Sequence, residues 1–99
     1  MNKSKFILTK SKKKDKKWSI TNNDKTIHFG QKGYSDFTIN KDPNRKKNYI
    51  KRHKKKENWN KSGINTAGFF AKHLLWNKPT LKKSIKSTED RFNIDIIKK

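Results

Sequence analysis

The chain has 99 residues, of which 28 are Lys or Arg and 8 are Asp or Glu, so its formal net charge is +20 at pH 7. This length fits one small domain over residues 1–99, with flexible ends expected at 1–4 and 97–99. No run of about 18 apolar residues is present, and no apolar segment follows the basic N-terminus, so we expect neither a membrane span nor a secretory signal. The absence of Cys excludes disulfides, thiolate nucleophiles and Cys-based zinc sites.

The positive charge is spread along the chain, with a net +8 over residues 1–33, +7 over 34–62 and +5 over 63–99. Such self-repulsion is relieved most simply by a polyanion, because phosphates neutralise the cations and release condensed counterions. Lys outnumbers Arg by 25 to 3, which favours contacts to the nucleic-acid backbone over recognition of bases. A composition rich in Lys, Asn and Ile is also typical of AT-rich genomes, but it does not explain why acidic residues are so few.

Three short apolar runs, at 5–9, 18–21 and 26–29, predict the strands of an antiparallel meander. The first connection, 10–17, is a basic loop, and the second, 22–24, is a turn of residues that tolerate left-handed backbone. Alternation places Trp18 and Ile20 on one face of the second strand, and Ile27 and Phe29 on one face of the third. The sheet therefore has an apolar side for helices to cover.

Residues 30–40 contain two glycines and the polar pair Ser35 and Asp36, and we expect a loop that leads into a short extended segment over 37–39. Asp42 directly before Pro43 is typical of a helix N-cap followed by proline at the first helical position, so a helix is predicted over 43–56. Its narrow apolar stripe consists of Tyr49, Ile50 and His53.

Thr66 is expected to cap a second helix over 67–76, whose apolar residues follow helical spacing and make it the core helix. Leu81 and Ile85 predict a short third helix. Alternating apolar residues then suggest a last strand that includes Phe92, Ile94 and Ile96. The fold class expected from this order is α+β: a small antiparallel sheet packed against two or three helices in a single compact domain.

Two stretches carry a resemblance to a known family. HFGQKGYSDFTINKDPNRKKNYIKRH (28–53) and KSGINTAGFFAKHLLWNKPTLKKSI (61–85) contain, in order, a GxxGYSD element, a KDPxRKxxYIxRH helix and an LLWNKP element. They resemble an uncharacterised family of small basic proteins encoded by giant nucleocytoplasmic large DNA viruses, which implies a viral origin but no established chemistry. In size, charge and a strand pair before a helix, the chain is also similar to the small methanogen chromosomal protein that bends DNA, without sharing its motifs.

The first candidate nucleic-acid contact is the loop over 10–17 with Trp18 at its edge. A lysine-rich hairpin loop can lie along a DNA groove, and an adjacent aromatic ring can stack or wedge at a base step. The alternatives are a solvated charge run and a core Trp18. Because the loop has no apolar residue, neutralising it is expected to leave folding intact. The candidate residues are Lys10, Lys12, Lys13, Lys14, Lys16, Lys17 and Trp18.

The second candidate is the basic face of the helix over 43–56. Its cations repel one another at helical spacing unless a phosphate backbone neutralises them, whereas the alternative is a face that only confers solubility. The candidate residues are Arg45, Lys46, Lys47, Lys51, Arg52, Lys54, Lys55 and Lys56.

Catalytic and metal sites have little support in the sequence. His28, His53 and His73 fall in separate segments at no ligand spacing, and the eight acidic residues are dispersed. Ser35 and Asp36 are interpreted as turn residues, and the glycine pair at 30 and 33 is too short for a phosphate-binding fingerprint. We expect no enzyme, no metal, no cofactor, no small-molecule substrate and no membrane partner.

The function expected is sequence-tolerant binding of double-stranded DNA, with condensation or bending of a viral genome through Lys–phosphate contacts. One alternative is a structural virion protein that binds an acidic protein partner. Another is an RNA-binding module that resembles a small ribosomal protein. The expected location is the virion interior with the genome, and the host cytoplasm or nucleus during infection.

Overall fold

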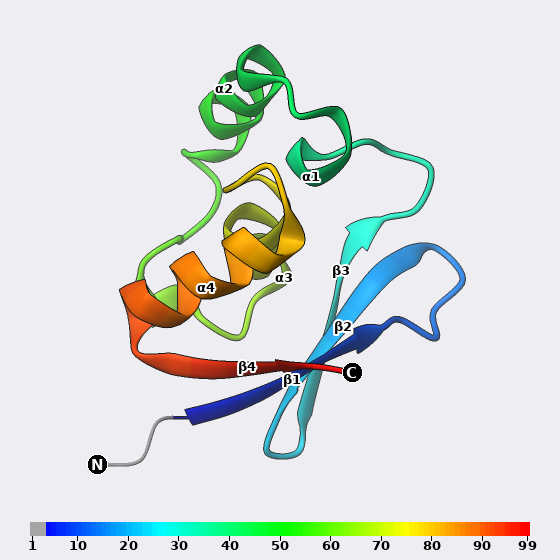
Figure 1. Cartoon of the computed structure of the whole chain (residues 1–99), viewed down its shortest axis with the longest axis vertical. Coiled ribbons are helices and arrows are strands. Elements are labelled where there is room, and N and C mark those ends of the chain that lie inside the picture. The colour runs from blue at the N-terminus through cyan, green and yellow to red at the C-terminus, as the bar shows by residue number, and fades with distance from the viewer. Residues whose placement is uncertain (1–3) are drawn as a thin grey trace.

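The computed structural model describes residues 4–99 and has the predicted α+β architecture, with helices packed on one face of a four-stranded sheet (Figure 1). The strand order is β3-β2-β1-β4. No helix within 4–99 is long and apolar enough to cross a membrane. The elements are β1 (Ser4–Lys10), β2 (Lys16–Asn22), β3 (Lys25–Gln31), α1 (Phe37–Asn40), α2 (Pro43–His53), a 3₁₀ turn (Lys61–Gly63), α3 (Ala67–Phe70), a π-helical turn (Ala71–Leu75), α4 (Leu81–Phe92) and β4 (Ile94–Lys98).

The predicted antiparallel meander is confirmed, and Asn23 adopts the left-handed backbone expected of its turn, with φ of 56°. Trp18 pairs with Phe29, and Ile20 pairs with Ile27, so these four side chains share one face. The expected loop over 10–17 is shorter than predicted, because the ladder extends outward and its two ends belong to β1 and β2.

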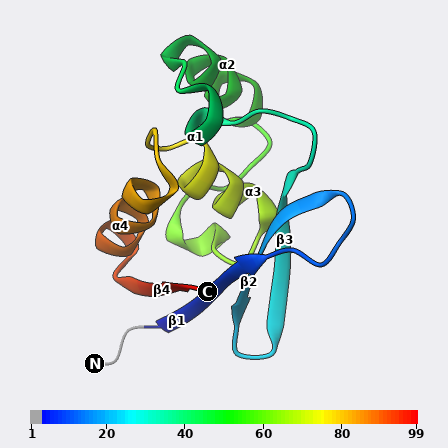
Figure 2. The ribbon, with the colours of Figure 1, turned by 45° about the vertical axis from the view of Figure 1, so that its right-hand side comes forward.

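The helices α3 and α4 cover the apolar face of the sheet, as two views of the ribbon show (Figures 1 and 2). Thr66 caps α3 as predicted, and its Oγ1 accepts a hydrogen bond from Phe69 N–H at 3.2 Å. The expected continuous α-helix over 67–76 is wrong in its second half, which is a π-helical turn. The wider turn buries both Leu74 and Leu75 in the core.

Two further predictions need correction in the segment before and within α2. The stretch expected to be extended forms α1, because the Asp36 side chain accepts from Thr38 N–H at 2.9 Å and caps a helical turn. Lys41, with φ of 52°, ends that turn. The predicted helix over 43–56 ends at His53 as an α-helix, and three consecutive lysines follow in a turn with no apolar side chain to anchor them.

The C-terminal segment differs from the prediction in a similar way. Phe92 is the last residue of α4, and Asn93 ends the helix with φ of 56°, so the strand begins only at Ile94. β4 pairs in parallel with β1, and Lys99 N–H donates to Leu8 O at 2.9 Å. Residues 97–98 and Ser4, expected to belong to flexible ends, are therefore part of the sheet. Residues 1–3 lie outside the described part of the chain.

Candidate nucleic-acid interface

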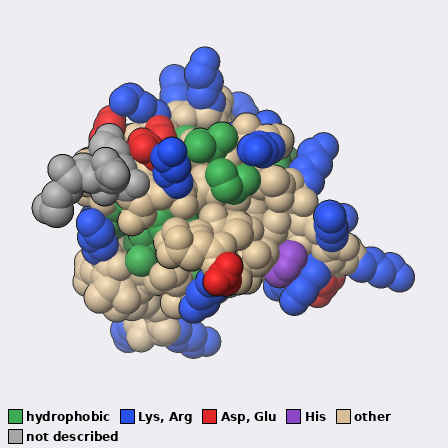
Figure 3. Space-filling model, turned by 90° about the horizontal axis from the view of Figure 1, so that it is seen from below, with side chains coloured by type: hydrophobic (Ala, Val, Ile, Leu, Met, Phe, Trp, Pro, Cys, Tyr) green, Lys and Arg blue, Asp and Glu red, His purple; other side chains and the backbone are tan. Residues whose placement is uncertain are grey.

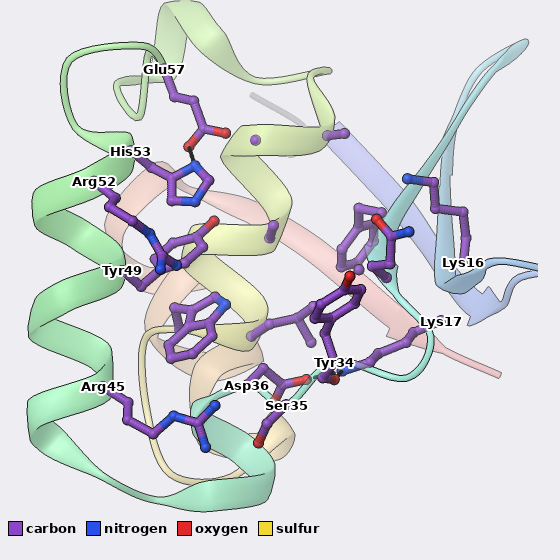
Figure 4. A pocket seen from close by; sticks show the side chains of 18 of the residues that line it. Lys16, Lys17, Tyr34, Ser35, Asp36, Arg45, Tyr49, Arg52, His53 and Glu57 are labelled. Carbon is purple, nitrogen blue, oxygen red and sulfur yellow. Dashed lines mark hydrogen bonds and ion pairs between the residues drawn. The ribbon is translucent and has the colours of Figure 1, made fainter.

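A cleft of about 650 Å³ lies between α2 and the segment that leaves β3 (Figure 4). One wall is α2. The other is formed by the start of β2, the end of β3 and residues 34–36. The floor is contributed by α3, the π-helical turn and Trp76. Segments between residues 16 and 76 thus meet at one hollow.

The position of α2 is set by its N-cap and by an aromatic stack. Asp42 accepts from Asn44 N–H at 2.9 Å and precedes Pro43, as predicted. The buried Tyr49 ring stacks on Trp76 with 4.5 Å between centroids and an interplanar angle of 7°. It also stacks on His53 at 4.3 Å. These contacts fix the rotation of α2, so that Arg45 and Arg52 extend toward the cleft (Figure 4).

The Glu57 carboxylate lies beside His53, at one end of this aromatic stack. Glu57 Oε2 lies 3.6 Å from His53 Nδ1 and accepts a hydrogen bond from Trp59 Nε1 at 3.2 Å. A Cβ at Gly68 would lie 2.6 Å from Glu57 Oε1, so a larger residue there would displace this carboxylate. Burial, and then the nearby charge of Glu57, raise the pKa of the Tyr49 hydroxyl above its usual value, so it remains protonated.

The opposite wall is held by an ion pair. Lys17 Nζ lies 2.7 Å from Asp36 Oδ2 and donates to Tyr34 O at 2.6 Å. Asp36 is only 2% exposed, and its other oxygen accepts from the backbone and hydroxyl of Thr38. The sequence predicts Ser35 and Asp36 as turn residues, but Asp36 caps α1 and neutralises Lys17.

Backbone geometry at the base of this wall requires glycine. Gly30 has φ of +77°, and a Cβ there would lie 2.8 Å from Leu75 Cδ1. An L-residue is strained at this φ and has no room for its side chain. The bend at Gly30 lets β3 pass close to the π-helical turn and so forms the floor of the cleft.

The structure brings parts of the two predicted basic elements together. Lys16 and Lys17 line the cleft on one side, and Arg45 and Arg52 line it on the other. The remaining candidate cations lie outside the cleft, and most of them are exposed: Lys10, Lys12, Lys13, Lys14, Lys46, Lys47, Lys51, Lys54, Lys55 and Lys56.

Three of the candidate residues make structural contacts that compete with a role in binding. Lys17 is held by Asp36, as described above. Lys46 Nζ donates to Asn77 O at 2.6 Å, and burial, followed by the charge of Lys78, lowers its pKa. Trp18 is half-buried against the core rather than projecting at the tip of the loop. The sequence could not reveal these contacts because the partners are distant in the chain.

Most cations of the molecule have no carboxylate partner. Within residues 4–99, the ion pairs are Lys17–Asp36 and Lys86–Asp90, and His53 lies 3.6 Å from Glu57, with which it forms an ion pair only when protonated. Figure 3 views the end of the molecule away from α2 and shows Lys and Arg side chains projecting around its outline. The basic surface therefore extends beyond α2 and the loop, as expected from the spread of charge along the sequence.

The histidines lie apart in the fold. His28 Nδ1 is 2.7 Å from Ser11 Oγ on the sheet. His73 is 1% exposed, with Nε2 at 2.9 Å from Trp59 O, and burial lowers its pKa to about 4. Across residues 4–99, no three His, Asp or Glu side chains come together as a metal-binding group.

Sequence reasoning missed two residues that line the cleft. Tyr34 is 68% exposed on the wall opposite α2, and Asn48 lies on α2 between the two arginines. The sequence signal for Tyr34 is an aromatic residue that lies between the glycine pair and the Asp36 helix cap, in a stretch predicted as a loop. Helical spacing is a signal for Asn48, because Arg45, Asn48 and Arg52 share one face.

A comparison with family models finds one match, over residues 6–53. The match is to DUF5754, a family of unknown function. The DUF5754 match spans β1 to α2 and so includes both walls of the cleft, whereas α3 and the π-helical turn lie beyond it. An uncharacterised family was expected over 28–85, so the match overlaps that stretch only in part. No curated protein and no solved structure matches the chain.

Proposed function

We propose that the protein binds nucleic acid through phosphate contacts, with double-stranded DNA as its main partner, and that it selects no sequence. The observation that supports this most is the run of exposed cations from α2 onward. Seven of them have no carboxylate partner within residues 4–99: Arg45, Lys47, Lys51, Arg52, Lys54, Lys55 and Lys56.

Repulsion within this run favours binding to a polyanion. Cations three and four residues apart on a helix destabilise it, and phosphates remove that repulsion while they release counterions from the nucleic acid. The helix is held to the body by the stack of Tyr49 on Trp76, so its cations are presented on a rigid support. Because the helix is already folded, its backbone loses little entropy when it binds.

The tip of the β1–β2 loop supplies a second set of contacts. Lys12, Lys13 and Lys14 are exposed there, and Lys13 N–H donates to Ser11 Oγ at 3.0 Å, which orders the turn. Neutralising phosphates on one side of a duplex lets the remaining repulsion bend it. Because Trp18 packs against the core, the proposed bending depends on charge and not on a wedge residue.

The resemblance to proteins of giant DNA viruses extends this proposal. The DNA would be a viral genome, and the protein would accompany it in the virion interior and, during infection, in the host cytoplasm or nucleus. Its role would be to condense or bend that genome, with no chemical step and no cofactor.

The experiment is a mobility-shift titration of the full chain with two unrelated random duplexes, competed by structured RNA and by poly-glutamate. We expect the affinities for the two duplexes to agree within about tenfold, because Lys–phosphate contacts do not distinguish bases. Stronger competition by RNA would favour the RNA-binding alternative. Stronger competition by poly-glutamate would favour an acidic protein partner, and either result would overturn the proposed function.

A further inference from the structure

We propose that the cleft between α2 and Tyr34 holds one unpaired nucleotide of the bound nucleic acid. Its phosphate would lie against Arg45 and Arg52, and its base would stack on the Tyr34 ring. This inference rests on the proposed function and names the part of the nucleic acid that the cleft recognises.

Arginine is concentrated at this cleft in a chain that otherwise uses lysine. Two of the three arginines, Arg45 and Arg52, line it from α2, while the chain contains 25 Lys. They are seven residues apart, about two helical turns, so they lie on the same face. The guanidinium group forms paired hydrogen bonds to phosphate oxygens, which a lysine ammonium cannot do.

The two carboxylates at the cleft already have partners within the protein. Asp36 is paired with Lys17 at 2.7 Å, and Glu57 contacts His53 and accepts from Trp59. Arg45 and Arg52 have no ion-pair partner among the side chains of residues 4–99. The cleft therefore presents two unpaired guanidinium groups, with Lys16 on the facing wall.

Tyr34 is the aromatic residue at this cleft with a ring available to a ligand. It is 68% exposed, and its ring projects between α2 and the facing strands (Figure 4). Its backbone carbonyl is fixed by Lys17 Nζ at 2.6 Å. Tyr49 is not available, because Trp76 and His53 stack on its ring. Base–aromatic stacking tolerates any base, in keeping with binding that selects no sequence.

The dimensions of the cleft agree with one nucleotide. Its volume of about 650 Å³ lies within the range of small-molecule sites, about 300–1,000 Å³. A stacked base pair within a duplex does not enter such a hollow, whereas a nucleotide from a single strand, a bulge or a gap does. Duplex DNA would lie on the outer cations, and the cleft would take the unpaired nucleotide.

The first experiment compares a duplex that carries one bulged 2-aminopurine nucleotide with the same duplex fully paired. The full chain should bind the bulged duplex about 5- to 150-fold more tightly, the range expected for one stacked base, and should quench the probe's fluorescence. Tyr34→Ala should abolish both effects and leave affinity for the paired duplex within about twofold. Tyr34→Phe, which keeps the ring, should retain them.

The second experiment uses two variants of α2 with equal charge change. The double variant Arg45→Gln, Arg52→Gln should lose the preference for the bulged duplex. The control Lys47→Gln, Lys51→Gln, which alters cations outside the cleft, should weaken binding to both duplexes equally. Loss of the preference in the control but not in the arginine variant would overturn the inference.

Failure of the inference is distinguishable from failure of the proposed function. A chain that binds paired duplex but shows no preference for the bulge, or that keeps its preference in Tyr34→Ala, overturns the nucleotide site alone. A chain that binds neither duplex overturns both.

Discussion

Lys17 and Asp36 join the sheet to the segment that begins α1, with 2.7 Å between Nζ and Oδ2. The pair is nearly enclosed, since the two side chains are 16% and 3% exposed. It holds Tyr34 at the cleft, because the same ammonium group donates to the Tyr34 carbonyl. A lysine within a run that looked wholly solvated is thus a structural residue.

This pair predicts a large effect on stability. Lys17→Met leaves the Asp36 carboxylate buried without its counter-ion, and we expect a loss on the order of 3 kcal/mol in the free energy of unfolding. Urea denaturation followed by circular dichroism measures it. The neighbouring Lys16→Met, which breaks no ion pair, is the matched control. Equal urea midpoints for the two variants would contradict the role of the pair. The expectation that neutralising the whole loop leaves folding intact is corrected accordingly.

The next prediction concerns the hydrophobic core, to which α3 and the π-helical turn contribute buried side chains. Phe70 and Leu74 are both 0% exposed, so Phe70→Ala or Leu74→Ala should reduce the free energy of unfolding by roughly 2–5 kcal/mol. Ile39→Ala, at a site 61% exposed, is the control and should change stability by less than about 0.5 kcal/mol. Thermal melts that do not separate the core variants from the control would show that the core lies elsewhere.

His73 predicts a specific dependence of stability on pH. Its pKa is lowered to about 4, chiefly by burial, while Lys72 and Arg91 also disfavour its charged form. His73 therefore binds a proton near pH 6.5 in the unfolded chain, but only near pH 4 in the folded chain. The stability that His73 contributes is complete above pH 6.5 and is lost as pH falls to about 4, a change of about 3 kcal/mol.

Urea midpoints measured between pH 8 and pH 4 test this dependence. The wild type should lose stability across that window. His73→Phe, whose ring fits among Phe69 and Phe92 but does not titrate, should have a flatter profile even where its stability at pH 8 is lower. A profile as steep as that of the wild type would contradict the assignment.

The two basic elements should respond differently to neutralisation. Changing Lys12, Lys13 and Lys14 together to Gln should leave folding intact and reduce the log–log salt slope of duplex binding by up to about 2.7, at about 0.9 per phosphate contact. In the helix variant, Gln replaces the cations at five positions: Lys47, Lys51, Arg52, Lys54 and Lys55. This variant should lower the affinity for duplex DNA at least as much as the loop variant does. In a circularisation assay, the loop variant should lose DNA compaction beyond its loss of affinity. Compaction that survives at saturation would assign deformation to α2 alone.

Local signals in the sequence predicted the elements that local chemistry determines. Alternating apolar residues identified the meander, and the Asp42–Pro43 and Thr66 caps placed the starts of α2 and α3. The strongly basic character of the surface was also predictable, because the charged side chains behind a net charge of +20 on a small domain must be largely exposed.

What the sequence did not predict depends on contacts between distant residues. The π-helical turn buries Leu74 and Leu75 together in the core, and Lys17, 19 residues away in the chain, pairs with the Asp36 that caps α1. The cleft is the largest omission. Its walls come from separate segments, and the packing of Tyr49 on Trp76 holds α2 opposite the other wall.

Phosphate binding itself is tested most directly by titrating random duplex DNA with the full chain at several salt concentrations. If about six to ten phosphates are contacted, the slope of log affinity against log salt should lie near −5 to −9. The slope should be the same for unrelated sequences. A slope shallower than about −2, or a strong preference for one sequence, would contradict binding through the cations of α2 and the loop.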